Sequence, residues 1–250
     1  MTQQADPILK GRFSSAVITR RIDLTDDLFK LWLAPADKFP FKPGQYCTIG
    51  VEGVERPYSI ASSPSEDEIE LFVEYIPLPY GELTPLLHTL KVGDEVTIRP
   101  RAKGLFVFEP DYKNHVMVST VTGVTPYVSM LRQYLESPPR GGDQFHLLEG
   151  ASYLDEFGYD EEIINLAKSH DEITFFPSVS RPDEDRNTAW TGAGGRINNL
   201  VLGYLADAKI PTEDTIVYAC GHPGMIEDLR EKLTDTGYAY TEERFWKDDD

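Results

Sequence analysis

Two short segments far apart in the chain carry residue types that could bind a phosphate group and a flat ring. Arg56, Tyr58 and Ser59 bring a cation, an aromatic ring and a hydroxyl to one strand-like stretch, with Arg56 and Tyr58 on one face and Ser59 on the other. A cation can neutralise a pyrophosphate, and an aromatic ring can lie along a flat heterocycle. Residues 215–220 form an apolar run that ends on Cys220, where a thiol meets the start of a predicted helix. Together the two segments offer groups that could hold the phosphate and the flat ring of a cofactor.

The elements that must position these residues change in character near position 110. The first half holds six short segments rich in β-branched and aromatic residues, separated by turn formers, at 13–19, 28–33, 45–51, 57–61, 68–76 and 95–99. The second half alternates apolar strand-like runs (116–119, 145–148, 173–179, 215–219) with helical stretches (126–136, 160–168, 197–206, 225–233). We therefore predict an antiparallel six-stranded barrel within 1–109, followed within 110–250 by a parallel sheet flanked by helices.

Composition limits the classes of protein and partner. The 250 residues carry a net charge of -18, which argues against nucleic acid or an anionic membrane as partner. No apolar run approaches the ~18 residues of a membrane span, and the N-terminal residues lack the basic start and apolar core of a leader, so we expect a cytoplasmic protein. Cys47 and Cys220 are too few for a disulfide framework or a four-cysteine iron–sulfur cluster.

Cys220 and His222 are close enough in sequence to suggest a metal site. A zinc site takes three or four ligands, however, and the other histidines lie in unrelated predicted elements without ligand spacing: His88, His115, His146 and His170. We therefore expect no bound metal.

Further short motifs surround the Arg-Pro-Tyr-Ser stretch in a specific order. Pro43-Gly44-Gln45 makes a turn before a strand, and downstream follow Gly81-Glu82-Leu83-Thr84, Lys91-Val92-Gly93-Asp94 and Gly104-Leu105-Phe106. In order and spacing these motifs resemble the ferredoxin/flavodoxin–NADP reductase family of bacterial flavoproteins, from about position 10 to Trp246. An Arg-x-Tyr-Ser string by itself is more often an ordinary edge strand, but the accompanying motifs favour the family.

The resemblance implies that the barrel binds FAD. Arg56 would contact the pyrophosphate, Tyr58 would lie along the isoalloxazine or ribityl region, and Ser59 would sit near flavin N5. Backbone amides after Gly81, with the Thr84 hydroxyl, would accept the second phosphate. The full set of FAD-binding residues that the resemblance implies is Arg56, Pro57, Tyr58, Ser59, Val73, Tyr75, Ile76, Gly81, Leu83, Thr84, Thr122, Phe245 and Trp246.

The resemblance also implies an NADP site in the second half. Arg181 and Arg196 match the two family elements that grip the 2′-phosphate, whereas Ser152 is neutral where the bacterial enzymes have a third basic residue. Val121 replaces a family glycine and crowds the backbone that the pyrophosphate approaches, so we expect weak coenzyme affinity. The stretch Gly192–Gly195 follows polar residues, not a buried strand, and is predicted to be a loop. The implied NADP-binding residues are Thr122, Gly123, Ser152, Ser180, Arg181, Arg196, Gly221 and Met225.

Three residues are expected at the reacting atoms: Ser59, Cys220 and Glu243. Cys220 would lie against the C4 edge of nicotinamide, with a buried structural cysteine as the alternative. Glu243 would supply a carboxylate near the flavin. The chain ends in a tail that would cover the flavin with Phe245 or Trp246 as a displaceable lid, although a plain hydrophobic anchor is the alternative.

The function that follows from the resemblance is an FAD-dependent ferredoxin/flavodoxin–NADP reductase, expected to be a monomer. It would pass electrons between NADPH, as a hydride, and a ferredoxin or flavodoxin that carries one electron at a time. These carriers are typically acidic, so the residues expected to meet them are basic: Lys42, Arg99, Arg101 and Lys103. Two alternatives stay open. One is a reductase for free flavin, oxygen or an oxygenase component, and the other is a non-catalytic flavin subunit of a larger complex.

Overall fold

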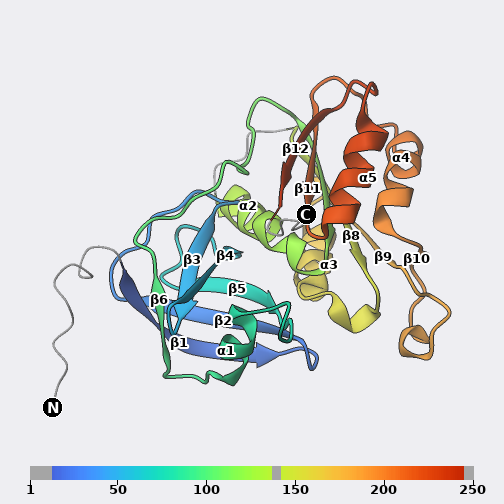
Figure 1. Cartoon of the computed structure of the whole chain (residues 1–250). Coiled ribbons are helices and arrows are strands. Elements are labelled where there is room, and N and C mark those ends of the chain that lie inside the picture. Colours follow the sequence, from blue (N-terminus) through green and yellow to red (C-terminus); the bar gives the residue numbers. More distant parts are fainter. Residues whose placement is uncertain (1–12, 137–141, 245–250) are drawn as a thin grey trace, which may run out of the picture. The chain divides into compact units, whose positions relative to one another are not determined.

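The computed structural model describes residues 13–136 and 142–244. Contacts divide the chain into two compact units, Met1–Val107 with Thr125–Ser137 and Phe108–Val124 with Pro138–Asp250. Figure 1 shows the strands and helices of both units. Each unit has its own cluster of buried apolar side chains.

The first unit is an antiparallel barrel of six strands: β1 (Ser14–Asp23), β2 (Leu28–Pro35), β3 (Tyr46–Val51), β4 (Val54–Ser59), β5 (Ile69–Glu74) and β6 (Glu95–Ile98). They pair in the order β4-β3-β6-β1-β2-β5 (Figure 1). The sheet nearly closes, because the amide of Ala61, just past β4, donates to the carbonyl of Glu70 in β5 at 2.8 Å. Ala16 and Ile18 alternate along β1 into the core, and the short helix α1 (Leu83–Thr89) adds Leu87 to it. The predicted barrel is confirmed.

Helix α2 (Thr125–Glu136) belongs with the barrel unit by its contacts. The Ser129 hydroxyl donates to the Ser62 carbonyl at 2.7 Å, and Arg132 Nη1 donates to Glu70 Oε2 at 2.6 Å. Glu70 is buried, so its carboxylate needs such a cationic partner. These bonds fasten α2 to β5 and to the stretch that precedes it. The domain ranges 1–109 and 110–250, which place this helix in the second half, stay a prediction.

The second unit is a parallel sheet with helices. Its strands are β7 (Asn114–Thr120), β8 (Gln144–Ala151), β9 (Ile173–Val179), β10 (Ala193–Gly194), β11 (Thr215–Cys220) and β12 (Ala239–Glu243), in the order β10-β9-β8-β7-β11-β12. Its helices are α3 (Asp160–Ser169), α4 (Ile197–Asp207) and α5 (Pro223–Leu233), with 3-10 turns η1 (Val121–Val124), η2 (Leu154–Glu156) and η3 (Asp185–Asn187).

Helices α4 and α5 lie side by side on the parallel sheet (Figure 1). Val201 of α4 and Leu229 of α5 share one apolar cluster with Val217 of β11. Strand β11 is buried at every position, as expected of a central parallel strand covered on both faces. The predicted parallel α/β unit is confirmed.

Two strands of this sheet lie outside the sequence-based prediction. β12 adds an edge strand beside β11 in residues that the sequence assigned to a tail. The stretch Gly192–Gly195 was predicted to be a loop, and this is wrong for Ala193 and Gly194, which pair with β9. The pairing is held because the Gly195 amide donates to the Val179 carbonyl at 2.8 Å and Ser178 Oγ donates to the Gly195 carbonyl at 2.7 Å.

Within residues 13–136 and 142–244, no helix combines the length and the apolar character that crossing a bilayer requires.

Candidate functional site

Ser59, the last residue of β4, carries a buried hydroxyl in the barrel unit. The side chain is 8% exposed, and its Oγ has no hydrogen-bond partner among the described residues. A buried hydroxyl without a partner costs free energy, so a bound group that hydrogen-bonds to Oγ would remove that cost. Ser59 is therefore placed as a ligand contact would be.

Tyr58 and Arg56 occupy the preceding positions of β4. Tyr58 packs against the barrel core, and burial raises the pKa of its phenol, with Arg56 opposing that shift. The Arg56 side chain is half exposed, donates to the Glu55 carbonyl at 2.7 Å, and forms an ion pair with Glu82 at the start of α1. The Arg56 guanidinium therefore lies where β4 approaches the N-terminal end of α1.

Gly81, just before α1, is a position where only glycine fits. A Cβ there would lie 2.0 Å from the Ile76 carbonyl oxygen. The Thr84 hydroxyl accepts from the Ile76 amide at 3.0 Å and donates to the Ile76 carbonyl at 2.9 Å. Its hydrogen-bonding capacity is largely used inside the protein, so Thr84 fixes this turn.

The remaining barrel residues that the sequence assigned to FAD differ in what they can offer. Val73 and Leu83 are enclosed in the core, so they offer a ligand almost no surface. Tyr75 is partly buried, and its ring centroid lies 4.7 Å from that of His88. Pro57 and Ile76 are also partly buried.

In the second unit, the turn after β7 carries backbone strain at Val121. Its φ is +44°, a left-handed conformation that a β-branched residue rarely adopts. The side chain packs on the small cluster of Ala151, Phe157 and Val179. The conformation explains why a glycine suits this position. Val121 keeps the glycine-like backbone and adds a side chain to it.

Two glycines allow the ends of β7 and β11 to approach closely. A Cβ on Gly123 would lie 2.2 Å from the Cys220 carbonyl oxygen. Gly221 has a φ of +129°, and a Cβ there would lie 2.3 Å from Thr120 Oγ1. The same Thr120 Oγ1 accepts from the His222 amide at 2.8 Å. The carboxyl edge of this sheet is therefore a tight backbone junction in front of α5.

Cys220 and Glu243 end the adjacent strands β11 and β12. Cys220 is fully buried, and burial raises the pKa of its thiol, with the Glu243 carboxylate adding to the shift. Burial also raises the pKa of Glu243 to about 8, and its Oε2 is buried without a hydrogen-bond partner among the described residues. Near neutral pH both groups are therefore mainly protonated and uncharged.

The residues expected to bind the coenzyme phosphate lie at the same edge of the sheet. Ser152 follows β8, and Ser180 and Arg181 follow β9. Arg196 is the N-cap residue of α4, and its exposed guanidinium has no ion-pair partner among the described residues. The Arg181 guanidinium donates to the Tyr153 hydroxyl at 2.8 Å.

Four further predicted residues remain, two inside the described ranges and two outside them. Met225 is 5% exposed and belongs to the apolar core beneath α5, which leaves its side chain little surface for a ligand. Thr122 lies in η1. Phe245 and Trp246 lie outside the described residues.

The imidazole of His222 caps a helix. His222 is the N-cap of α5, and its Nδ1 accepts from the Gly224 amide at 3.1 Å. In the part of the chain that the structure describes, no three His, Cys, Asp or Glu side chains gather as metal ligands would.

Sequence reasoning missed three residues at the edge of the sheet that is expected to bind the coenzyme phosphate: Arg186, Tyr153 and Glu184. Arg186 Cζ lies 4.2 Å from the Tyr153 ring centroid, and Tyr153 donates to Glu184. The family motifs stop at the strand ends, whereas these residues come from the loops beyond, so pattern spacing gave no signal. Two cues were available in the sequence. Tyr153 directly follows Ser152 at the predicted end of a strand, and Arg186 lies in an acidic loop.

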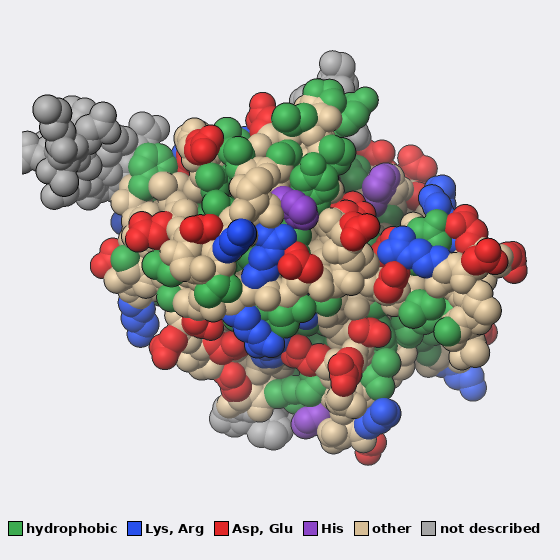
Figure 2. Space-filling view, turned by 90° about the horizontal axis from the view of Figure 1, so that it is seen from below, with side chains coloured by type: hydrophobic (Ala, Val, Ile, Leu, Met, Phe, Trp, Pro, Cys, Tyr) green, Lys and Arg blue, Asp and Glu red, His purple; other side chains and the backbone are tan. Residues whose placement is uncertain are grey.

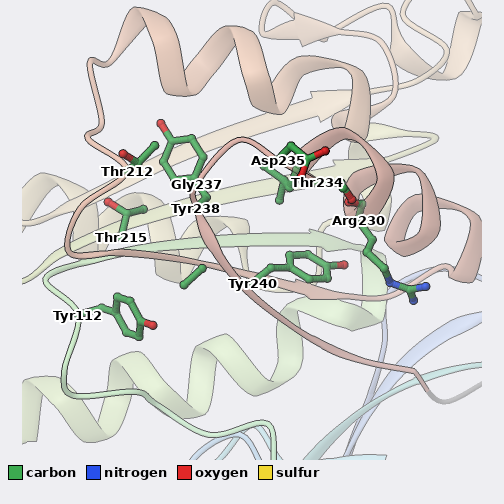
Figure 3. Close-up of a pocket in the computed structure, with 11 residues that line it drawn as sticks. Tyr112, Thr212, Thr215, Arg230, Thr234, Asp235, Gly237, Tyr238 and Tyr240 are labelled. Carbon is green, nitrogen blue, oxygen red and sulfur yellow. The ribbon is translucent and has the colours of Figure 1, made fainter.

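A separate cavity of about 620 Å³ lies at the other end of the second sheet. Figure 3 shows Tyr112, Tyr238 and Tyr240 around it, with Arg230 at one side. It lies beside Thr215 and Ala239, which begin β11 and β12, whereas Cys220 and Glu243 end those strands. The cavity is therefore distinct from the candidate coenzyme edge.

The chain is similar to known proteins over most of its length. Residues 117–231 match the model of the oxidoreductase NAD-binding domain. A flavodoxin/ferredoxin–NADP reductase of Shigella flexneri is 31% identical over 226 residues, which cover 85% of this chain and 86% of the relative. An NADH-cytochrome b5 reductase 1 of Aspergillus oryzae is 27% identical over 82% of this chain and 71% of its own. The crystal structure of a ferredoxin NADP⁺ reductase from Neisseria gonorrhoeae, with bound FAD and NADP, matches with a TM-score of 0.82 at 25% identity, covering 94% of this chain and 99% of that one.

Proposed function

Because this chain belongs to the ferredoxin–NADP reductase family, we propose that it is an FAD-dependent oxidoreductase that exchanges a hydride with NADP(H) and single electrons with a ferredoxin or flavodoxin. The observation that carries the flavin part of the proposal is the buried, unpartnered hydroxyl of Ser59 at the end of the Arg-Pro-Tyr-Ser strand. FAD supplies the ability to take two electrons at once and release them singly.

The residues of the barrel fit the parts of FAD. Arg56 brings a half-exposed guanidinium toward the start of α1, where it would leave Glu82 to neutralise a pyrophosphate. Tyr58 offers a ring that is neutral at physiological pH, and Ser59 offers a hydroxyl that has no other partner among the described residues. Gly81 lets the turn before α1 pack tightly against the Ile76 carbonyl, which sets the path of the backbone into the helix. We assign these four residues to holding and orienting the cofactor.

The residues of the second unit fit the nicotinamide dinucleotide. Gly123 and Gly221 let the ends of β7 and β11 pack closely, and this junction forms the edge of the sheet at which a dinucleotide would lie. Cys220 is fully buried and protonated, so it would lie as a neutral thiol beneath the nicotinamide site at the end of β11. Glu243 holds a proton at its carboxyl near neutral pH, so it would be able to give or take one at the end of β12.

A basic and apolar patch on the barrel supports an acidic protein as acceptor. We call Lys42, Arg101, Lys103 and Leu105 the barrel patch. Its cations are exposed and have no ion-pair partner among the described residues, and Leu105 is 94% exposed. Gln45 joins the two segments, because its side chain accepts from the Lys42 amide at 2.9 Å and donates to the Gly104 carbonyl at 3.1 Å.

The barrel patch stands out against the charge of the whole chain. The net charge is -18, and Figure 2 shows acidic side chains spread over one face of the molecule with fewer basic ones among them. An acidic carrier would be repelled at long range, so local cations around an exposed apolar side chain are needed to dock it. Arg99 is a weaker candidate than the sequence predicted, because Glu55 already binds its guanidinium at 2.6 and 2.9 Å.

Steady-state turnover with rival acceptors tests the proposed function. With NADPH as donor, we expect a ferredoxin or flavodoxin to be reduced with a higher kcat/KM than free FMN, free FAD or oxygen. A preference for free flavin or for oxygen would instead indicate a flavin or oxygenase-component reductase. Absence of turnover with every acceptor, in a protein that still binds FAD, would support a non-catalytic subunit. The cytoplasmic location and the monomeric state expected from the sequence stay predictions.

A further inference from the structure

Two arginines and one tyrosine meet beyond the carboxyl ends of β8 and β9. The Tyr153 ring lies 4.2 Å from Arg186 Cζ and 5.3 Å from Arg181 Cζ. Arg181 Nη1 also donates to the Tyr153 hydroxyl, and this hydrogen bond is the main reason that the pKa of Arg181 is raised. In an α/β sheet of this kind, such a corner is where the adenosine end of a dinucleotide lies.

Carboxylates already bind both of these arginines. Glu184 accepts from the Tyr153 hydroxyl, and its Oε1 lies 3.7 Å from Arg181 Nη1. Arg186 binds Asp155 at 2.8 and 3.0 Å and lies 3.8 Å from Glu156. A dianionic 2′-phosphate at this corner would therefore meet carboxylates as well as guanidinium groups.

The two nicotinamide coenzymes are bound at this position by side chains of opposite charge. NADPH carries a 2′-phosphate, which arginines bind in a forked geometry. NADH carries a 2′-hydroxyl, which a carboxylate binds by accepting its hydrogen. Arg181 suits the first and Glu184 the second, and they share the Tyr153 hydroxyl as a partner.

We propose that Glu184 is a specificity-determining residue that competes with the 2′-phosphate for Arg181 and accepts a hydrogen bond from the 2′-hydroxyl of NADH. This chain therefore uses both coenzymes, and the balance between them is set by the Arg181–Glu184 pair. The inference rests on the proposed function, because it requires a nicotinamide dinucleotide at this edge. The pair is about half exposed on each side, so it shifts the balance without closing the site to either coenzyme.

The loop that carries Glu184 is held by a different residue. Asn187 is 1% exposed, and its amide donates to the carbonyls of Ser152 and Arg181, at 2.9 Å each, and accepts from the Leu154 amide at 2.8 Å. These bonds use no atom of the Glu184 side chain. Replacing Glu184 by glutamine therefore removes the charge while leaving an acceptor for Tyr153 and the loop in place.

The test compares Glu184→Gln with the neighbouring Asp183→Asn in the FAD-loaded protein. Asp183 is exposed and has no ion-pair partner among the described residues, so the control removes the same charge from the same loop without touching Arg181. Two readouts are measured: the ratio of kcat/KM for NADPH to that for NADH, and calorimetric binding of 2′,5′-ADP and 5′-AMP.

We expect Glu184→Gln to raise the NADPH/NADH ratio by about ten-fold and to tighten 2′,5′-ADP by a similar factor, with 5′-AMP changed less than about two-fold. Arg181→Gln should lower the ratio by about ten-fold. Equal effects of Glu184→Gln and Asp183→Asn, or a wild-type protein that NADH does not reduce, would overturn the inference. A wild-type protein that neither coenzyme reduces would instead overturn the proposed function.

Discussion

Cys220 and Glu243 are register partners at the ends of the adjacent parallel strands β11 and β12. The buried Glu243 carboxyl, with a pKa of about 8, also contributes to the raised pKa of the Cys220 thiol. The end of this strand pair is therefore a place where a proton is retained near neutral pH.

The raised pKa of Glu243 predicts a pH dependence of stability. The folded-state pKa of about 8 lies above the ordinary value of 4.5, so the folded protein holds a proton that the unfolded chain has released between these values. The stabilisation is complete below pH 4.5 and is lost as the pH rises toward 8, by an amount on the order of 1–3 kcal/mol after allowance for partial exposure. Urea unfolding between pH 5 and pH 8.5 measures it.

Glu243→Gln is the matched variant for that measurement. Glutamine is neutral at every pH, so the part of the slope that comes from this residue should vanish. A wild-type protein and a Glu243→Gln variant with the same loss of unfolding free energy from pH 5 to pH 8.5 would contradict the assignment.

The left-handed backbone of Val121 predicts an inverted order of stability among small substitutions. Val121→Ala loses the contact with the cluster of Phe157 and Val179 and keeps a Cβ at a φ of +44°, whereas Val121→Gly also relieves that strain. The glycine variant should therefore be more stable than the alanine variant by about 1 kcal/mol, the reverse of the usual helix or strand order. Chemical unfolding of both variants checks this. An alanine variant that is the more stable of the two would show that the strain is not real.

The close approach at Gly221 predicts a large cost for one added methyl group. Gly221→Ala would place Cβ 2.3 Å from Thr120 Oγ1 at a φ of +129°, so we expect a loss of at least about 2 kcal/mol of unfolding free energy. Gly203→Ala is the control, because no atom lies within 4 Å of its Cβ in α4, and it should gain about 0.5–1 kcal/mol. Thermal unfolding distinguishes the two, and a Gly221→Ala protein of wild-type stability would refute the tight junction.

The barrel patch predicts an acceptor-specific effect of charge reversal. Lys103→Glu should raise the KM for an acidic ferredoxin or flavodoxin by about five- to ten-fold at low salt, with the difference shrinking as salt is added. Turnover with ferricyanide as a small acceptor should be unchanged. Lys91→Glu, at the other end of β6, is the control. Equal effects of the two reversals would place the docking surface elsewhere.

The sequence predicted the fold well because both halves follow simple periodic rules. Alternation along β1 and the turn at Pro43-Gly44-Gln45 are local signals, and so is the long apolar run of β11. β12 was missed because its five positions are all partly buried, and its residues, Ala239–Glu243, mix apolar and charged types. Its partner strand decides its conformation, not its own pattern.

The candidate site was predicted less completely than the fold. Ser59, Cys220 and Gly221 were reached through motifs, since they lie in or beside strand ends whose spacing is regular. Glu184 and Arg186 lie in an irregular loop, and their importance depends on a contact with Tyr153 about thirty residues earlier in the chain. Val121 was recognised as an unusual substitution, but only the backbone reveals that it keeps a left-handed φ.

The visible absorption of the purified protein during anaerobic addition of NADPH tests the central claim most directly. The account predicts a yellow protein that contains FAD and whose flavin absorption bleaches as NADPH is added, with recovery when an acidic one-electron carrier is supplied. A colourless protein that takes up no added FAD, or a bound flavin that neither NADPH nor NADH bleaches, would contradict it.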